Sequence, residues 1–209
     1  MSVIVGSFGG VEQKRLKSLL AYSSVSHMGY TLIAFSAGTF EGMQTVLCYL
    51  FLYMIAGLCT WSIFLVLRLK YNYSKKQNKD LTDLNSLSKA NNMLALFFST
   101  VLLSIAGMPP MVGFLVKIGI FLASIEASMY FVAIISILCS VISTFYYIRI
   151  IKIMYFESSI TGKLYHPIKS NISILIVCLF YFLLFLFINP TLVYLISHKI
   201  VILLSITSV

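Results

Sequence analysis

Long apolar runs separated by short polar segments make up most of the 209-residue chain. A helix of roughly 20 apolar residues crosses a hydrocarbon layer about 30 Å thick. Applied along the chain, this window predicts spans over residues 19–40, 43–69, 93–124, 129–155 and 172–196. The pattern therefore predicts an all-α polytopic membrane protein with about five complete transmembrane helices.

The third apolar run is long enough for two half-length helices in series, and it contains the segment "SIAGMPPMVGFLVK". Pro109 and Pro110 remove backbone donors and clash with the preceding turn, while Gly107 permits unusual dihedral angles. Carbonyls freed there must be satisfied by protein or by water at membrane depth. The segment predicts a discontinuous helix, the feature with which transporters place ions and water near the midplane. A proline kink that serves only packing is the alternative.

Composition supports a membrane location, because 60% of the residues are hydrophobic and only 10% are charged. The net charge of +9 could suggest a nucleic-acid partner. The basic residues fall almost entirely between the apolar runs, however, where they orient helices in a membrane, so no nucleic acid is expected. The four cysteines lie singly, without the spacing of a metal site or a disulfide framework, and are interpreted as packing residues.

Charge placement alternates along the chain. Every second connection is basic, whereas the other two carry Glu41 and Glu126 and no lysine or arginine. This alternation predicts that all basic connections share one face of the membrane. The basic residues concerned are Lys14, Arg15, Lys17, Arg68, Lys70, Lys75, Lys76, Lys79, Lys89, Arg149, Lys152, Lys163 and Lys169.

Lys117 is not explained by topology, because it follows Pro110 by about 10 Å of helix and lies inside an apolar run. A charged lysine at the centre of a span costs about 2.5 to 3.5 kcal/mol and usually faces a protein interior or a hydrated cavity. Burial eases the step to a neutral amine, so such a lysine can load and release a proton. The alternative is a lysine that extends to the interface.

The first span carries a second polar stripe in "KRLKSLLAYSSVSHMGYTL". Helical spacings of three and four place its members on one face, where they could hold a file of waters and where His27 could relay protons. Ordinary interhelical hydrogen bonding is the alternative. The candidates are Lys17, Ser24, His27 and Thr31, with Ser23, Ser26 and Tyr30 on an adjacent strip. For a strip in the fourth span (Ser136, Ser140, Ser143, Thr144 and Tyr147), packing is the favoured interpretation.

Four ordered segments carry a family resemblance: "KSLLAYSSVSHMGY", "DLNSLSK", "LLSIAGMPPMVGFLVK" and "VISTFYYIRIIKIMYF". Their order and spacing resemble the antiporter-like membrane subunits of respiratory complex I, NADH:ubiquinone oxidoreductase, and among these chain 2, or chain N. The resemblance covers roughly residues 1–157. It implies the second half of an inverted-repeat subunit, in which two five-helix units each contain a broken helix.

The resemblance also implies roles for individual residues. Lys117 matches the protonatable residue of the family beside the second broken helix, and Lys17 matches the basic residue at the entrance to the preceding helix. Helical spacing, rather than the resemblance, makes His27 with Ser24, Tyr30 and Thr31 the candidates for a polar path beside the break at Gly107, Pro109 and Pro110.

For the domain organisation, we expect residues 1–10 to be the tail of an incomplete helix and residues 11–157 to form the antiporter-like transmembrane unit. Residues 158–209 are expected to provide a loop, a closing transmembrane helix and a C-terminal tail. A chain with this incomplete start suggests that a separate polypeptide supplies the N-terminal half. The alternatives are that the sequence is a fragment of a longer chain and that the first half was lost from an ancestor.

Function is expected to be proton translocation within the complex, coupled to distant quinone reduction. NADH, FMN, iron–sulfur clusters and ubiquinone are expected elsewhere in the complex, because this chain has no nucleotide loop or cluster-binding cysteine set. Other complex I membrane subunits and lipids are the expected partners, in the mitochondrial inner membrane or a bacterial plasma membrane. The alternatives are a multi-subunit cation/proton antiporter and a structural scaffold without transport.

Overall fold

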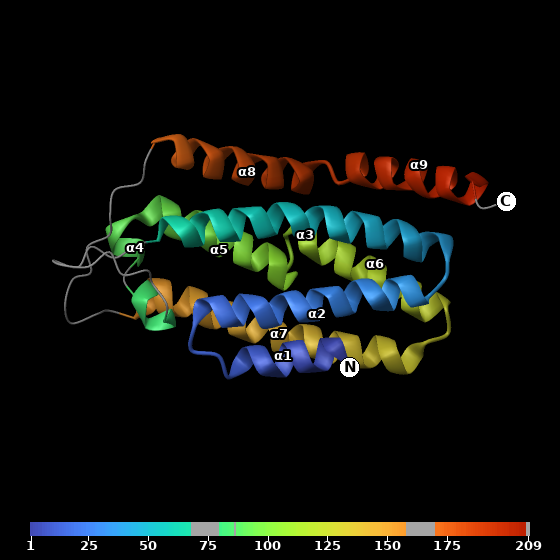
Figure 1. The fold of residues 1–209 in the computed structure, drawn as a ribbon, viewed down its shortest axis with the longest axis horizontal. Coiled ribbons are helices and arrows are strands. Elements are labelled where there is room, and N and C mark those ends of the chain that lie inside the picture. The colour runs from blue at the N-terminus through green and yellow to red at the C-terminus, as the bar shows by residue number, and fades with distance from the viewer. Residues whose placement is uncertain (68–79, 86, 158–169, 208–209) are drawn as a thin grey trace.

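The computed structural model describes residues 1–67, 80–85, 87–157 and 170–207, and all regular structure in these ranges is helical. Figure 1 shows an elongated bundle whose main helices run side by side along the long axis. The all-α fold class is therefore confirmed. The helices are α1 (Ser2–Val11), α2 (Leu16–Ser36), α3 (Phe40–Val66), η1 (Leu81–Leu84), α4 (Leu87–Ala90), α5 (Asn92–Ala106), α6 (Val112–Glu126), α7 (Tyr130–Phe156), α8 (Ser170–Ile188) and α9 (Thr191–Thr207).

Two of the described helices, α3 and α7, are each long and apolar enough to cross a membrane. The pair formed by α8 and α9 meets the same criterion together but is bent by 81° at its break. By length and composition, the described helices thus supply two spans, or three if the bent pair counts as one. The sequence-based number of five stays a prediction.

The connection between α2 and α3 differs by a few residues from the predicted boundaries. Gly38 has a φ of 65°, a left-handed conformation that glycine adopts without a Cβ penalty. Thr39 then caps α3, because its side-chain oxygen accepts a hydrogen bond of 3.0 Å from the amide of Gly42. Helix α3 consequently begins at Phe40 rather than near residue 43.

The predicted discontinuous helix is confirmed as α5 and α6, which are separated by residues 107–111. Gly107 ends α5 with a φ of 77°. The amide of Met108 donates to the carbonyl of Leu103, and the amide of Gly107 donates to that of Ser104, which is the Schellman pattern of helix termination. The last carbonyls of α5 therefore lie at the break without the next helical turn to cover them.

The expected closing helix over residues 172–196 is divided into α8 and α9. Pro190 stands at the division, where it cannot donate a backbone hydrogen bond and disfavours a helical conformation at Asn189. After the division, α9 continues to Thr207 and so includes most of the predicted C-terminal tail. Helix α9 packs against α3, where the side-chain amide of Gln44 donates a hydrogen bond of 3.1 Å to the backbone carbonyl of Tyr194.

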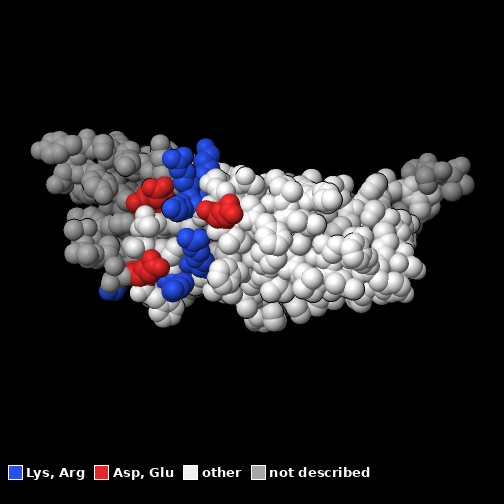
Figure 2. Space-filling view, turned by 90° about the horizontal axis from the view of Figure 1, so that it is seen from below, with Lys and Arg blue, Asp and Glu red and all other residues white. Residues whose placement is uncertain are grey.

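Charged side chains gather at one end of the bundle, as Figure 2 shows for one face. The described basic residues of this end come from the start of α2, from α4 and from the last turns of α7, in agreement with the predicted alternation. At the opposite end, the side chains of Glu41 and Glu126 interact. The basic residues predicted within 68–79 and 158–169 lie outside the described residues.

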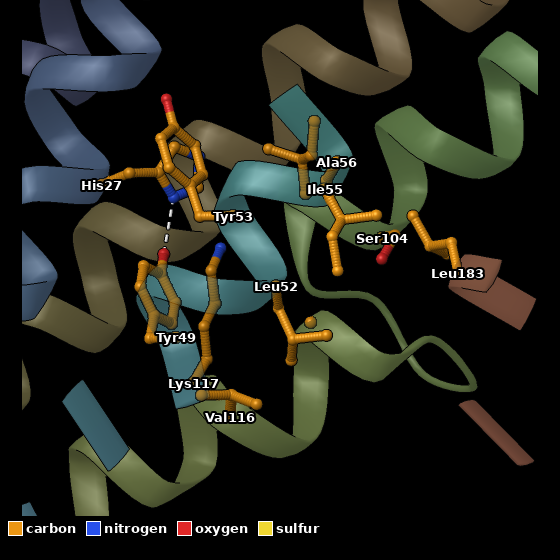
Figure 3. A pocket seen from close by; sticks show the side chains of 12 residues that line it. His27, Tyr49, Leu52, Tyr53, Ile55, Ala56, Ser104, Val116, Lys117 and Leu183 are labelled. Carbon is orange, nitrogen blue, oxygen red and sulfur yellow. Dashed lines mark hydrogen bonds between the residues drawn. The ribbon is translucent and has the colours of Figure 1, made fainter. Parts of the chain in front are cut away.

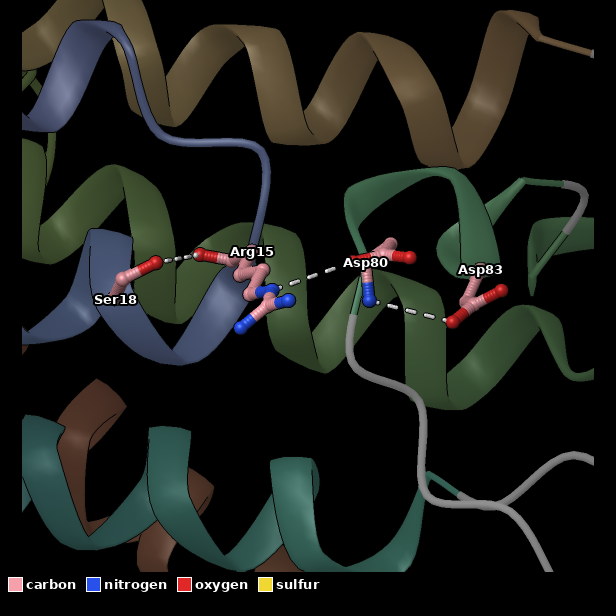
Figure 4. Close-up of polar contacts among 4 residues, drawn as sticks. All are labelled: Arg15, Ser18, Asp80 and Asp83. Atoms are coloured by element: carbon pink, nitrogen blue, oxygen red, sulfur yellow. Dashed lines mark hydrogen bonds and ion pairs between the residues drawn. The ribbon is translucent and has the colours of Figure 1, made fainter.

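The segment that begins at Asp80 and includes η1 lies over the charged end of α2 (Figure 4). The amide of Leu81 donates a hydrogen bond of 2.9 Å to the carbonyl of Lys14, and Arg15 lies 4.0 Å from a carboxylate oxygen of Asp80. Both ion-pair side chains are well exposed, so the pair contributes little, typically about 1 kcal/mol or less. Three leucines of η1 and α4 are buried in the core beneath it and provide the anchorage: Leu81, Leu84 and Leu87.

Candidate functional site

A cavity of about 30 Å³ lies where α2, α3, α5 and α6 meet, beside the break between α5 and α6. That volume holds at least one water molecule if two or more polar groups face it. Figure 3 shows His27 of α2, Tyr49 and Tyr53 of α3, Ser104 of α5 and Lys117 of α6 around this space. The aliphatic part of the lining includes Leu52, Ile55, Ala56, Ile105, Val116 and Leu183.

Lys117 is buried, with only 4% of its surface exposed. Its Nζ donates a hydrogen bond of 2.6 Å to the carbonyl of Ala106, the last residue of α5. This carbonyl belongs to the C-terminal end of a helix, where the backbone dipole favours a positive charge. The ring of Tyr30, 5.4 Å from Nζ at its centroid, presents an aromatic face to the same ammonium group.

Two glycines create the space that brings Lys117 to the end of α5. A Cβ atom at Gly107 would lie 2.7 Å from Cδ of Lys117 and 3.2 Å from its Nζ. A Cβ atom at Gly113, in the first turn of α6, would lie against the backbone carbonyl of Ser104. The first turn of α6 can therefore approach the last turn of α5 only because residue 113 has no side chain.

His27 is buried, and hydroxyl groups from two other helices occupy both of its ring nitrogens. Nδ1 lies 2.5 Å from the phenol oxygen of Tyr49 in α3, and Nε2 lies 3.2 Å from that of Tyr147 in α7. The ring of Tyr53 packs on the imidazole, with 4.7 Å between the ring centroids. His27 therefore joins the cavity lining on one side to α7 on the other.

The structure brings together some of the residues that the sequence predicted for the site. Lys117 and His27 line one cavity, Gly107 contacts Lys117, and Tyr30 lies beneath its ammonium group. Their convergence agrees with the expectation of a polar site at the break.

Other predicted site residues lie elsewhere. Lys17 is exposed at the start of α2, within the charged end. The hydroxyl groups of Ser24 and Thr31 donate to carbonyls of their own helix, those of Ala21 and Met28. None of these three lines the cavity. Pro109 and Pro110 are exposed in the connection between α5 and α6.

Sequence reasoning did not single out Tyr49, Tyr53 or Ser104 as site residues. The spacing of four residues between Tyr49 and Tyr53 on one helix face was a signal, because two phenols on one face of a span require polar partners. Tyr147 was assigned to packing, although its hydroxyl contacts His27.

Comparison with known proteins identifies the family of the chain. The family model described as "NADH:quinone oxidoreductase/Mrp antiporter, TM" matches residues 1–143. The chain belongs to this family. Family members similar to it include NADH-ubiquinone oxidoreductase chain 2 of Marchantia polymorpha, 39% identical over 95% of this chain and 39% of the relative. NADH-quinone oxidoreductase subunit N of Parvibaculum lavamentivorans is 35% identical over 90% of the chain and 38% of the relative. The chain thus spans about two fifths of the length of these family members.

Solved structures with a similar fold include chains from two membrane complexes. A chain of respiratory complex I from Thermus thermophilus with bound aureothin matches with a TM-score of 0.78 and 27% identity, covering 92% of this chain and 42% of that chain. A chain of the Mrp complex from Dietzia matches with a TM-score of 0.82 over 96% of this chain and 45% of that chain. At 18% identity, the second match concerns the fold alone.

Proposed function

We propose that this chain is a proton-translocating membrane subunit of NADH:ubiquinone oxidoreductase, corresponding to the C-terminal part of chain 2. One observation carries the proposal: Lys117 is a buried ammonium donor held on the last carbonyl of a broken helix, beside a water-sized cavity that also contains His27. Membership of the family and the similarity to chain 2 and subunit N support it.

Lys117 is suited to hold a proton at this depth. The carbonyl of Ala106, the C-terminal end of α5 and the ring of Tyr30 all stabilise the ammonium form. The aliphatic lining of the cavity favours the neutral amine, because burial disfavours an isolated charge. A small movement of Nζ away from Ala106 therefore shifts the balance toward proton release. A distant redox event would drive that movement through the neighbouring helices.

The reaction that powers proton movement would take place in other subunits. NADH, FMN, iron–sulfur clusters and ubiquinone would be bound elsewhere in the complex, and this chain would contribute the proton path in the mitochondrial inner membrane. In a bacterium, the plasma membrane would take its place.

The partners would be other complex I membrane subunits, lipids and a separate polypeptide that supplies the N-terminal half of the subunit. An open groove between α1 and α7 supports an occupant on that side. It has a volume of about 950 Å³ and an apolar lining that includes Val5, Phe8, Val141 and Phe145.

A second candidate function is that of a subunit in a multi-subunit cation/proton antiporter, which the fold of the Mrp chain favours. Purification of the native assembly separates the two functions. Flavin and iron–sulfur proteins in stoichiometric amounts support complex I, whereas their absence from an active antiporter assembly supports the second function.

Replacement of Lys117 tests the proposal and also the alternative of a structural scaffold. Lys117→Met keeps the aliphatic stem and removes the charge, and Lys117→Arg keeps a charge that a guanidinium does not release. We expect both variants to assemble and to lose most proton translocation per NADH oxidised in reconstituted vesicles. Lys152→Met is the matched control, because Lys152 is exposed on α7 at the charged end.

The outcome depends on comparing equal amounts of assembled complex. If Lys117→Met translocates protons at the rate and yield of Lys152→Met, Lys117 is structural and the scaffold function replaces the proposed one.

A further inference from the structure

The contact between His27 and Tyr147 connects the cavity to a part of the bundle that the cavity does not reach. Tyr49 lines the cavity together with Lys117, and its hydroxyl contacts Nδ1 of His27. Tyr147 does not line the cavity, and its hydroxyl contacts Nε2 of the same ring. The imidazole is thus the physical link between hydroxyl groups on two sides of α2.

Tyr147 belongs to a buried pair with Tyr146, whose ring centroid lies 4.6 Å away. Both side chains are 0% exposed. The hydroxyl of Tyr146 has no hydrogen-bond partner among the described residues. Because buried hydroxyl groups in proteins are nearly always hydrogen-bonded to protein or to ordered water, this one marks a place for a bound water.

Two serines beside Tyr146 would hold such a water. Ser143, Ser26 and also Tyr147 stand close to its hydroxyl without forming a hydrogen bond of good geometry to it. The two serines donate their own hydroxyl protons to carbonyls of their helices, Ser26 to Ser23 at 2.7 Å and Ser143 to Cys139 at 2.9 Å. The serine oxygens are therefore left as acceptors, so a water at Tyr146 has three polar neighbours, a number typical of buried waters.

The pair of Tyr146 and Tyr147 lies on the side of the cavity that faces the charged end of the bundle. Tyr146 precedes Arg149 by three residues, which is less than one turn of α7, and Arg149 donates to the carbonyl of Val11 at the charged end. Lys117 lies on α6, which runs from the break toward the opposite end at Glu126. The link through His27 therefore leads from the cavity toward the charged end.

We propose that Tyr147 and Tyr49 relay protons through His27 between the charged end and the cavity of Lys117, and that a water bound at Tyr146 extends the relay. This inference rests on the proposed function and adds the residues that connect Lys117 to one side of the membrane. The proposed role of Lys117 does not depend on this relay.

Each transfer in the relay balances. A neutral imidazole carries one N–H and one free nitrogen, while a phenol both donates and accepts. The proton of Tyr147 moves to Nε2 as the proton on Nδ1 moves to Tyr49, so the imidazole changes tautomer without becoming charged. Tyr49 passes its proton to the water or amine of the cavity, and Tyr147 regains one from the water at Tyr146.

The test uses tyrosine-to-phenylalanine variants of the complete complex, since each removes one oxygen and keeps the ring. Tyr147→Phe and Tyr49→Phe are compared with Tyr181→Phe, whose side chain is 66% exposed on α8. Measurements are the proton translocation rate in vesicles per amount of assembled complex and the ratio of that rate in H₂O and D₂O. We expect the first two variants to slow translocation about tenfold, equivalent to a barrier increase of about 1.4 kcal/mol, and to change the isotope ratio. Tyr181→Phe should do neither.

The relay and its extension are tested by separate results. Normal translocation and an unchanged isotope ratio in Tyr147→Phe would do so, and if Lys117→Met still abolishes translocation, the proposed function stands without the relay. Normal translocation in Lys117→Met would remove both. Should Tyr147→Phe fail to assemble, Tyr49→Phe decides the relay by the same two measurements. A map of the unmodified complex that resolves ordered waters must show one at the hydroxyl of Tyr146, and an empty site there excludes the extension.

Discussion

A single substitution, Gly107→Ala, perturbs both the helix break and the position of Lys117. The residue has a φ of 77°, where a side chain costs about 1–2 kcal/mol. The added Cβ would also lie 2.7 Å from Cδ of Lys117, too close for any real contact, so the lysine stem must move. Because the stem carries Nζ, the hydrogen bond of 2.6 Å to the carbonyl of Ala106 is strained or broken.

The expected size of the effect follows from that hydrogen bond. A hydrogen bond to a charged group contributes about 1.5–3 kcal/mol. Its loss therefore changes the free-energy difference between the protonated and the neutral form of Lys117 by that amount. At about 1.4 kcal/mol for each factor of ten, proton translocation should slow by about ten- to a hundredfold. The backbone penalty adds a loss of stability that is separate from this change in rate.

A matched control separates the two effects. Gly38 also has a positive φ, 65°, but a Cβ atom there would meet nothing within 4 Å. Gly38→Ala should therefore lower the thermal unfolding midpoint of the assembled complex by less than Gly107→Ala, because it carries the backbone penalty without displacing a buried lysine. It should leave translocation per assembled complex unchanged. Equal translocation in the two variants would refute the argument that Gly107 acts through Lys117.

Two further predictions concern the charged end. In a Cys178→Ser background, cysteines at the exposed positions Lys89 and Glu126 should react with a membrane-impermeant reagent from opposite sides, and labelling from one side would contradict the bundle orientation. Arg15→Ala should cost about 1 kcal/mol of stability or less, because the pair with Asp80 is exposed, whereas Leu84→Ala should cost about 2–5 kcal/mol because Leu84 is 1% exposed. Thermal unfolding of the assembled variants measures both, and a larger loss from Arg15→Ala would mean that the ion pair anchors the segment.

The lengths of the apolar runs predicted the helical fold, and the glycine and two prolines predicted the break at Gly107, because both features depend on local properties. Long apolar runs favour helices in a membrane, and a glycine followed by two prolines ends a helix in any environment. The same local rule applied to Pro190, but the apolar residues around it were interpreted as one uninterrupted span. The bend of 81° between α8 and α9 shows that Pro190 interrupts the helix although the apolar run continues through it.

The candidate site was less predictable, because its composition depends on which helix faces meet. Lys117 was identifiable as a charge within an apolar run, and His27 as a titratable residue within another. The contacts of His27 come from residues 22 and 120 positions away, and no periodicity within one helix indicates them. Lys17 illustrates the reverse case, since it shares the helix of His27 yet is exposed at the charged end.

The distance of Lys117 from the break is explained by the direction in which helical side chains point. Each Cα–Cβ bond in an α-helix is tilted toward the N-terminus, so a lysine in the second turn of α6 reaches back to the start of its own helix. There the N-terminal end of α6 disfavours a cation, whereas the C-terminal end of α5 favours one. The hydrogen bond to Ala106 shows that the ammonium group lies on the carbonyl of α5. A lysine two turns later in α6 would lie about 11 Å further along the helix, out of reach of that carbonyl. The lysine and the helix break therefore act together, because the break exposes the negative C-terminal end of α5 at a distance that a lysine at position 117 can reach.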